Sequence, residues 1–482
     1  MIDLRPVAMI IGVLLCILAA GMTLPAAVDA AVGNRDWTVF AISSLMTVFI
    51  GLALVLTCRA DDFRINLRQA FIMTNLIWVT LPAFAALPFM FSELGLSYTD
   101  AYFEAMSGIT TTGSTVIVGL DYAPPGILLW RGILQWMGGI GIIIMALTIL
   151  PMLRVGGMQL FKVEAFEAQE KVLPRATQLA SALTMIYVLL TSVWAIMLYM
   201  AGMESLDAVV HAMTTIATGG YSTVDGSVGH FDSALIDAII TVGMVMGAIP
   251  FLLYFQMMRG KPLSLFADSQ VQWFLASAGA GVIAVSFWLW WDQGFDPLNA
   301  LRYGSFNTVS VMTGTGYATA DYWQWSGVAV TILFYLMFVG GCAGSTSCGI
   351  KIFRLQVLAA TARIQILRLL QPHGVFIAYY NKRPIDESVS ASVMGFFFLY
   401  GLSVGVLAIA LSFLGLDFIT ALTGAATAIS NVGPGLGSII GPAGNFASMP
   451  DAAKWLLSGG MLLGRLELFT VLVMLVPQFW RD

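Results

Sequence analysis

Charged residues are scarce in this sequence, and the shortage limits what kind of protein it can be. Asp, Glu, Lys and Arg make up 10% of the 482 residues, and 59% of the residues are hydrophobic. A soluble globular protein carries about 25% charged residues. The net charge is only −5 and there is no basic domain, which argues against nucleic acid as a partner. We therefore expect a chain that is solvated mainly by lipid.

Side chains with reactive chemistry are also few. The sequence contains three histidines and four cysteines. It has no Ser-His-Asp arrangement, no metal-ligand spacing and no phosphate-binding loop, so nothing supports an enzyme or a covalently bound cofactor. The cysteines all lie in or beside apolar segments, where free thiols are expected rather than disulfides: Cys16, Cys58, Cys342 and Cys348.

Long hydrophobic runs are what the sequence has in abundance. About 20 apolar residues cross a bilayer. Full spans are predicted near residues 7–28, 38–57, 69–91, 125–152, 178–202, 233–258, 270–291, 324–350, 389–414 and 455–479. From the third span onward the spans form pairs. A semi-polar stretch separates the two members of each pair, and it contains an apolar piece too short to span.

The first hydrophobic run has two interpretations. Arg5, the apolar stretch from Val7 to Leu18 and the small residues up to Ala30 resemble a secretory signal. The apolar stretch nearly continues to Val28, which is long enough to span, so a retained helix is the preferred interpretation. Cleavage would leave the downstream topology unchanged.

The positive charges indicate an orientation. With a cytoplasmic N-terminus, most of the 22 lysines and arginines fall in inner loops. The exceptions are Arg35, Arg131, Arg302 and Lys454 in outer segments and Arg465 within a span. We therefore predict that both termini are cytoplasmic and that the four short apolar pieces lie on the outer side.

The four semi-polar stretches repeat one pattern when they are aligned on Gly113, Gly220, Gly316 and Gly433. Six positions before the glycine lie small hydroxyl residues: Ser107, Thr214, Ser310 and Thr427. Four positions before lie large apolar residues: Ile109, Ile216, Met312 and Ile429. Small residues lie twelve positions before: Ala101, Ala208, Gly304 and Ala421. Ordinary glycine-rich loops between helices are the alternative, and agreement of four loops in register argues against it.

The repeat predicts an ion pathway. A short helix that ends within the membrane directs its negative dipole end at a cation. A following extended segment can replace an ion's hydration shell with backbone carbonyls, and glycine permits the necessary angles. The expected fold is an all-α polytopic membrane protein, with two N-terminal transmembrane helices and four helix–pore loop–helix repeats around one central pore. The divisions are 1–68, 69–175, 176–264, 265–385 and 386–482.

Six motifs lie along the chain: Thr-Thr-Thr-Gly-Ser at 110–114, Ala-Thr-Gly-Gly-Tyr-Ser-Thr at 217–223, Thr-Gly-Thr-Gly-Tyr at 313–317, Ser-Asn-Val-Gly-Pro-Gly-Leu-Gly at 430–437, the glycine-rich 340–351 and Gly-Arg-Leu-Glu at 464–467. Over essentially the whole chain, these motifs resemble the TrkH/KtrB family of potassium transporters, within the Trk/Ktr/HKT superfamily. The extra N-terminal helix pair makes the chain more similar to the TrkH branch than to the shorter KtrB branch.

The resemblance implies a K⁺ selectivity filter with one glycine from each repeat. Its residues are Thr110, Thr111, Thr112, Gly113, Ala217, Thr218, Gly219, Gly220, Thr313, Gly314, Thr315, Gly316, Ser430, Asn431, Val432 and Gly433. K⁺ ions would be held at Thr111, Thr112, Thr218, Gly219, Gly314, Thr315, Asn431 and Val432. Four glycines imply preference for K⁺, because a serine at the first is associated with sodium transport in plant relatives. Gly219 could replace Gly220 in the alignment, and Tyr221, matched to Tyr317, favours Gly220.

The eighth predicted span is interrupted by residues that do not make a stable helix. They are Gly340, Gly341, Gly344, Ser345, Thr346, Ser347 and Gly349. A kink near the inner surface is one interpretation. The resemblance implies instead an intramembrane gate loop at 340–349, beneath the filter and beside Arg465.

Arg465 needs a partner, because an arginine within a span costs roughly 2.5–3.5 kcal/mol. Glu467 is a poor candidate on a helix, and the carbonyls and hydroxyls of the gate loop are better ones. A snorkelling arginine near the interface is the alternative. Lys351, at the end of the loop, is expected at the cytoplasmic surface.

Four polar residues of the pore helices have local interpretations. Asp100, Glu104 and Asp207 lie toward the outer ends of the first two, where capping is the favoured role and attraction of cations the alternative. His211, at the position of Glu104 in the second repeat, is expected to be packed.

Two charged inner segments, 154–175 and 351–387, are predicted to be either a solvated face or a docking surface. The second contains Arg354, Arg363 and Arg368. The resemblance implies a cytosolic TrkA-type nucleotide-binding regulatory subunit as partner, a homodimer, and a bacterial inner (plasma) membrane location. Function is expected to be channel-like K⁺ uptake, with a K⁺ symporter coupled to H⁺ or Na⁺ as the alternative.

Overall fold

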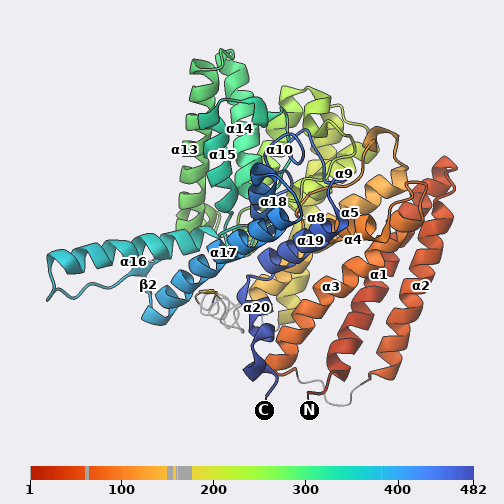
Figure 1. Ribbon diagram of the computed structural model, residues 1–482, viewed down its shortest axis with the longest axis horizontal. Coiled ribbons are helices and arrows are strands. Elements are labelled where there is room, and N and C mark those ends of the chain that lie inside the picture. The colour runs from red at the N-terminus through yellow and green to blue at the C-terminus, as the bar shows by residue number, and fades with distance from the viewer. Residues whose placement is uncertain are drawn as a thin grey trace.

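The structure is a computed structural model that describes residues 2–59, 65–148, 156–158, 160, 176–381 and 383–481. Helices make up almost all of its regular structure, which confirms the all-α class. The described residues also contain one small antiparallel hairpin, β1 (Tyr379–Tyr380) with β2 (Arg383–Pro384). Figure 1 shows the helices side by side, with both chain ends at the same end of the molecule.

Seven described helices are long and apolar enough to cross a membrane. They are α1 (Arg5–Val32), α2 (Trp37–Thr57), α3 (Leu67–Phe91), α5 (Pro125–Thr148), α8 (Ala176–Met200), α13 (Ser269–Trp291) and α17 (Glu387–Phe413). Each coincides with a predicted span, because uninterrupted apolar length is a signal that the sequence carries directly.

Three predicted spans are not continuous helices. The sixth is divided into α10 (Ala234–Gly247) and α11 (Phe251–Met258), which meet at 92°. Pro250 immediately precedes α11 and lacks the N–H that would continue the ladder. The prediction of a single continuous helix is also wrong for the tenth span. There α19 (Asp451–Arg465) meets the following helical segment (Phe469–Leu475) at 107°.

The interruption in the eighth span is confirmed. Its helix, α15 (Gly327–Phe338), ends before the glycine-rich segment, and α16 (Ile352–Leu370) begins after it. Figure 1 shows α16 extending away from the rest of the molecule, and the hairpin lies beside the N-terminal half of this helix, where Tyr379 and Tyr380 line one pocket with Gln356.

Each of the four repeats places a short helix between two spans. These pore helices are α4 (Tyr98–Ile109), α9 (Ser205–Ile216), α14 (Pro297–Thr313) and α18 (Phe418–Ser430). Ser97, Asp296 and Asp417 accept a backbone N–H at the starts of α4, α14 and α18, so polar caps fix where three of them begin.

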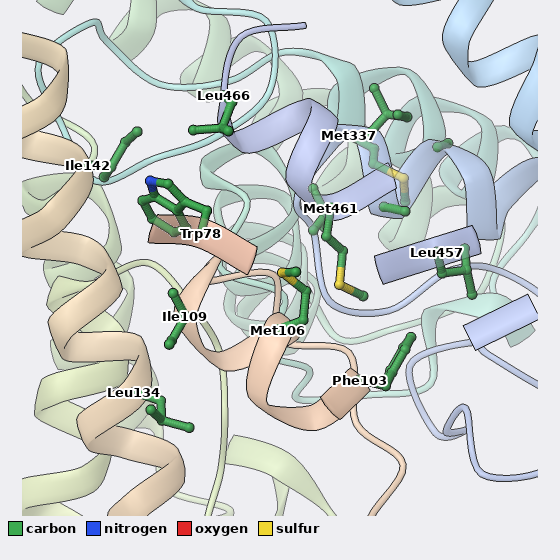
Figure 2. Packing of buried hydrophobic residues seen from close by; sticks show 14 of the residues in the cluster. Trp78, Phe103, Met106, Ile109, Leu134, Ile142, Met337, Leu457, Met461 and Leu466 are labelled. Atoms are coloured by element: carbon green, nitrogen blue, oxygen red, sulfur yellow. The ribbon is translucent and has the colours of Figure 1, made fainter. Parts of the chain in front are cut away.

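The four repeats share one interior with the N-terminal pair. Figure 2 shows Trp78 of α3, Phe103 of α4, Leu134 of α5, Met337 of α15 and Met461 of α19 in a single buried cluster. Helices α1 and α2 pack against each other at one side of the molecule (Figure 1). A β-carbon at Gly12 would lie 2.6 Å from the Gly51 carbonyl oxygen, so small residues permit this close crossing.

Candidate ion-conducting site

The loops that follow the four pore helices meet at their glycines. A β-carbon added at any of the four would come within about 3 Å of backbone from a neighbouring loop. The contacts are Gly113 with Gly219 O (2.3 Å), Gly220 with Thr315 O (1.8 Å), Gly316 with Gly433 N (2.8 Å) and Gly433 with Gly113 C (3.1 Å). Their order closes a ring through repeats one, two, three and four, and a side chain at any of these glycines would meet the backbone of a neighbouring loop.

The backbone of the four loops follows one pattern. Two positions before the glycine, each loop is left-handed, with φ of +52° at Thr111, +49° at Thr218, +78° at Gly314 and +52° at Asn431. The glycine is left-handed again in the first three loops, with φ of +88°, +76° and +84°. The residue between these two positions has no positive φ in any loop, so left-handed residues alternate with a residue that is not left-handed in the first three loops. Such alternation can turn successive carbonyls toward one axis, as a carbonyl-lined ion path requires.

This pattern settles the register of the second loop. Gly220 has a φ of +76°, like Gly113 and Gly316, whereas Gly219 has no positive φ. Gly220 therefore occupies the equivalent backbone position. The fourth loop departs from the pattern, because Gly433 has no positive φ.

Each pore helix ends just before its loop. The final helical residues are Ile109, Ile216, Thr313 and Ser430. The last carbonyls of a helix carry partial negative charge and have no intrahelical partners. Four such ends converging on one ring create a region that favours a cation.

The repeated positions of the pore helices are buried as their chemistry predicts. The large apolar position is at most 4% exposed in all four helices: Ile109, Ile216, Met312 and Ile429. The hydroxyl position is at most 1% exposed: Ser107, Thr214, Ser310 and Thr427. At Gly304 a β-carbon would lie 3.1 Å from the Ser286 backbone, which explains a small residue twelve positions before the glycine.

A cavity opens on the side of the ring that follows the glycines. All four glycines line it, together with the segments that leave the loops and the side chains of Arg131 and Asp225. Polar groups and backbone therefore surround the approach to the ring from this side.

A side chain of α5 forms hydrogen bonds with the backbone of the second loop. Gln135 donates from Nε2 to the Gly219 carbonyl at 2.6 Å and accepts the Tyr221 N–H at 3.0 Å. Neither Gln135 nor Arg131 was expected at this site from the sequence, although two polar residues four apart on one face of an apolar span were an available signal.

The glycine-rich segment after α15 forms a buried loop on the other side of the ring. Its ends are joined by the Gly340 N–H to the Ile350 carbonyl at 2.8 Å and the Ile350 N–H to the Phe338 carbonyl at 3.0 Å. A β-carbon at Gly340 would lie 1.9 Å from the Cys348 carbonyl oxygen. The two strands of the loop therefore pass closer than side chains would permit.

This loop bonds the C-terminal ends of two pore helices. Thr346 donates to the Ile216 carbonyl at 3.0 Å, and Ser347 donates to the Thr313 carbonyl at 2.6 Å. Thr218, two positions before its glycine, lies 3.2 Å from Thr346, hydroxyl to hydroxyl. The loop therefore lies against the residues that precede the glycines, opposite the cavity.

Arg465 lies beside this loop and is 3% exposed. Its Nη1 bonds the Thr346 carbonyl at 3.4 Å and the Cys348 sulfur, and its Nη2 bonds the Gly138 carbonyl at 3.2 Å. The expectation that loop carbonyls, not Glu467, solvate this arginine is confirmed. The snorkelling alternative is wrong because the side chain does not reach solvent.

Lys351 and Arg354 were expected at the inner surface, and both expectations are wrong. Lys351 is 8% exposed and donates to the Ser347 carbonyl. Arg354 is fully buried, pairs with Glu467 and donates to the Gly156 carbonyl at 2.9 Å. The first turn of α16 still lies inside the protein, so its cations need internal partners.

Two other arginines of the predicted inner segment 351–387 lie at the surface of the protein. Arg363 and Arg368 are exposed on α16. Arg64 and Lys382 lie outside the described residues. So does segment 154–175, apart from residues 156–158 and 160.

The acidic residues of the first pore helix are not simple caps. Asp100 lies in the first turn of α4 but pairs with Lys454 of α19. Glu104 is fully buried and pairs with Arg131 at 2.9 Å, so the capping interpretation is wrong for it. Asp207 lies in the first turn of α9, and His211 is fully buried, as expected.

Known proteins resemble this chain over its whole length. A family model named TrkH, cation transport protein, matches residues 37–481. The Trk system potassium uptake protein TrkI of Halomonas elongata is 46% identical over 99% of this chain and 97% of its own length. The corresponding TrkH of Salmonella typhimurium is 38% identical over 99% of each chain. The crystal structure of the potassium transporter TrkH from Vibrio parahaemolyticus matches with a TM-score of 0.93, at 34% identity and full coverage of both chains.

Proposed function

This chain belongs to the TrkH family of cation transport proteins and transports potassium, and we propose that K⁺ passes through the ring of its four glycine-bearing loops. The observation that carries this proposal is the close approach of Gly113, Gly220, Gly316 and Gly433, at the ends of four pore helices, to the backbone of a neighbouring loop. A single polypeptide thereby supplies four quadrants of backbone to one site.

The proposed K⁺ ligands are the residues one and two positions before each glycine. They are Thr111, Thr112, Thr218, Gly219, Gly314, Thr315, Asn431 and Val432. The alternating backbone and the converging helix ends support this assignment. The Gly219 carbonyl already accepts from Gln135, so it would offer K⁺ its second lone pair.

We propose that residues 340–349 and Arg465 close the path on the far side of the ring. Support comes from the bonds of Thr346 and Ser347 to the pore helices and from the buried position of Arg465. A positive charge that is 3% exposed raises the electrostatic barrier for a cation, because the surroundings screen it weakly. Conduction would require this loop to move away.

The surroundings of the pathway are proposed from the charge distribution and from the family. We assign cytoplasmic termini from the positive-inside bias. Membership of the family is the basis for proposing a bacterial inner (plasma) membrane, a homodimer and a TrkA-type regulatory subunit that binds the inner face. The division into an N-terminal pair, 1–68, and repeats 69–175, 176–264, 265–385 and 386–482 belongs to this proposal.

Channel-like transport is favoured over coupling to H⁺ or Na⁺. A coupled transporter needs a titratable or cation-binding group in the pathway. Among the described residues, the buried carboxylates nearest the ring and the gate are Glu104 and Glu467, and each is paired with an arginine. Neither is free to exchange a proton or a sodium ion.

Replacement of Gly113 by serine tests the filter. Its added β-carbon would lie 2.3 Å from the Gly219 carbonyl, so the ring should widen and Na⁺ should enter more readily. The measurement is ⁸⁶Rb⁺ and ²²Na⁺ flux into proteoliposomes that contain the purified protein. A K⁺-to-Na⁺ ratio equal to that of the unaltered protein would overturn the assignment.

A further inference from the structure

One polar position in the pore helices contacts the segment that leaves the loop of the same repeat. Nine positions before the glycine, Glu104 of α4 accepts the Val116 N–H at 2.9 Å and the Thr115 hydroxyl at 3.1 Å. In the second repeat the same position is His211, whose Nε2 lies 3.0 Å from the Ser222 hydroxyl. Two different side chains thus make the same connection.

The third repeat makes the contact with an amide. Asn307, again nine positions before the glycine, donates to the Thr319 hydroxyl at 2.8 Å and accepts its N–H at 3.3 Å. The fourth repeat has Gly424 at this position, and the preceding Thr423 bonds both the N–H and the carbonyl of Leu436, at 3.1 and 3.3 Å. Every repeat therefore has a polar clamp between its pore helix and its exit segment.

We propose that these clamps, formed by Glu104, His211, Asn307 and Thr423, position the ring and thereby set its preference for K⁺ over Na⁺. The proposal rests on the filter assignment above. Each loop is held at its start by the end of the pore helix and after its glycine by the clamp, so the carbonyls between them cannot move inward to surround a smaller ion. The clamps are positioning residues, because they act through the backbone that would touch the ion.

The tyrosine after the glycine links one clamp to the next repeat. Tyr221 donates to the Glu104 carbonyl at 2.8 Å, and Tyr317 is bonded to the Thr214 hydroxyl and lies 3.4 Å from the His211 carbonyl. Each hydroxyl reaches back from its own loop to the pore helix of the preceding repeat. Displacement of one clamp would therefore disturb two loops.

The first clamp has an additional charged partner. Arg131 bonds Glu104 at 2.9 Å and the Ser222 carbonyl, and its guanidinium lies 4.0 Å from the centre of the Tyr221 ring. Both charges of the pair are at most 1% exposed, so removal of one would leave the other buried without its partner. Truncation of Glu104 itself would therefore destabilise the protein, and a loss of selectivity could not be separated from a loss of folding.

The test therefore changes the clamped hydroxyls. Thr115→Val and Thr319→Val keep the shape of the side chain but remove the hydroxyl that bonds Glu104 or Asn307. The measurement is ⁸⁶Rb⁺ and ²²Na⁺ flux by the full-length protein in proteoliposomes. We expect the K⁺-to-Na⁺ ratio to fall about three- to tenfold, as loss of one hydrogen bond would give. Thr115→Ser and Thr319→Ser restore the hydroxyl and should restore the ratio.

A second pair of charges serves as the control. Asp237 of α10 pairs with Arg302 of α14 at 2.6 Å, and no hydrogen bond of this pair reaches a loop of the ring. Asp237→Asn should leave the ratio unchanged. The clamp proposal is overturned if Gly113→Ser lowers the K⁺-to-Na⁺ flux ratio but both valine variants leave it unchanged. The valine variants must also keep the thermal stability of the unaltered protein. If Gly113→Ser also has no effect, the filter assignment itself fails.

Discussion

At the scale of single residues, the ring depends on positions where a β-carbon does not fit. At Gly220 it would lie 1.8 Å from the Thr315 carbonyl oxygen, and φ there is +76°. Alanine would meet backbone that cannot rotate away, in a conformation that costs about 1–2 kcal/mol for an L-residue. Gly220→Ala is therefore expected to abolish selective K⁺ flux in proteoliposomes.

Gly279 of α13 provides the matched control, because nothing lies within 4 Å of its β-carbon position. Alanine in that helix should stabilise the protein by up to about 1 kcal/mol and leave flux unchanged. Normal, selective flux in the Gly220 variant would contradict the contact between the second and third loops.

At the scale of elements, the buried loop between α15 and α16 carries the proposed gating role. Arg465 bonds Thr346 and Cys348 of this loop, so Arg465→Ala should release it and remove a positive charge from the path. We expect a higher basal K⁺ flux without any regulatory subunit. Arg363→Ala, at an exposed position on α16, should not change it. A stable Arg465 variant with unaltered flux would remove the gating role.

The bend after α19 depends on a second buried arginine. Arg354 of α16 pairs with Glu467, which lies in the bend with a φ of +62°. Glu467→Gln would leave Arg354 fully buried without a compensating charge, at a cost of about 3–5 kcal/mol. The expected result is a large fall in thermal stability in detergent, partly recovered by adding Arg354→Gln. Equal melting temperatures for the single variant and the unaltered protein would show that the pair contributes nothing.

At the scale of the whole molecule, the arrangement predicts passive K⁺ movement. Four repeats enclose one path, and in the part of the chain that the structure describes the buried carboxylates Glu104 and Glu467 are already paired with arginines. In K⁺-loaded proteoliposomes, flux should follow the K⁺ electrochemical gradient, whether or not a pH or Na⁺ gradient is present. Uphill K⁺ accumulation that appears only with one of these gradients would instead establish coupling.

Fourfold symmetry at this scale is approximate. Gly433 lacks the left-handed backbone of the other three glycines, and the fourth clamp uses Thr423, one position earlier than the others. This quadrant is also the least regular in sequence, since Asn431 and Pro434 have no counterparts in the other loops.

The sequence by itself determined the apolar spans, the four-part repeat and the positions of its glycines, because these depend on composition and spacing along the chain. It did not predict the bend after Arg465, because Gly464 still lies within α19 and residues 466–468 contain no glycine or proline that would mark the break. Nor did it place Lys351 and Arg354 inside the protein or pair Glu104 with Arg131. Those features depend on partners far away in the chain, such as Arg354 and Glu467, which are 113 residues apart. Only the packed structure decides which buried charges meet, because burial without a partner is too costly for any of them to remain alone.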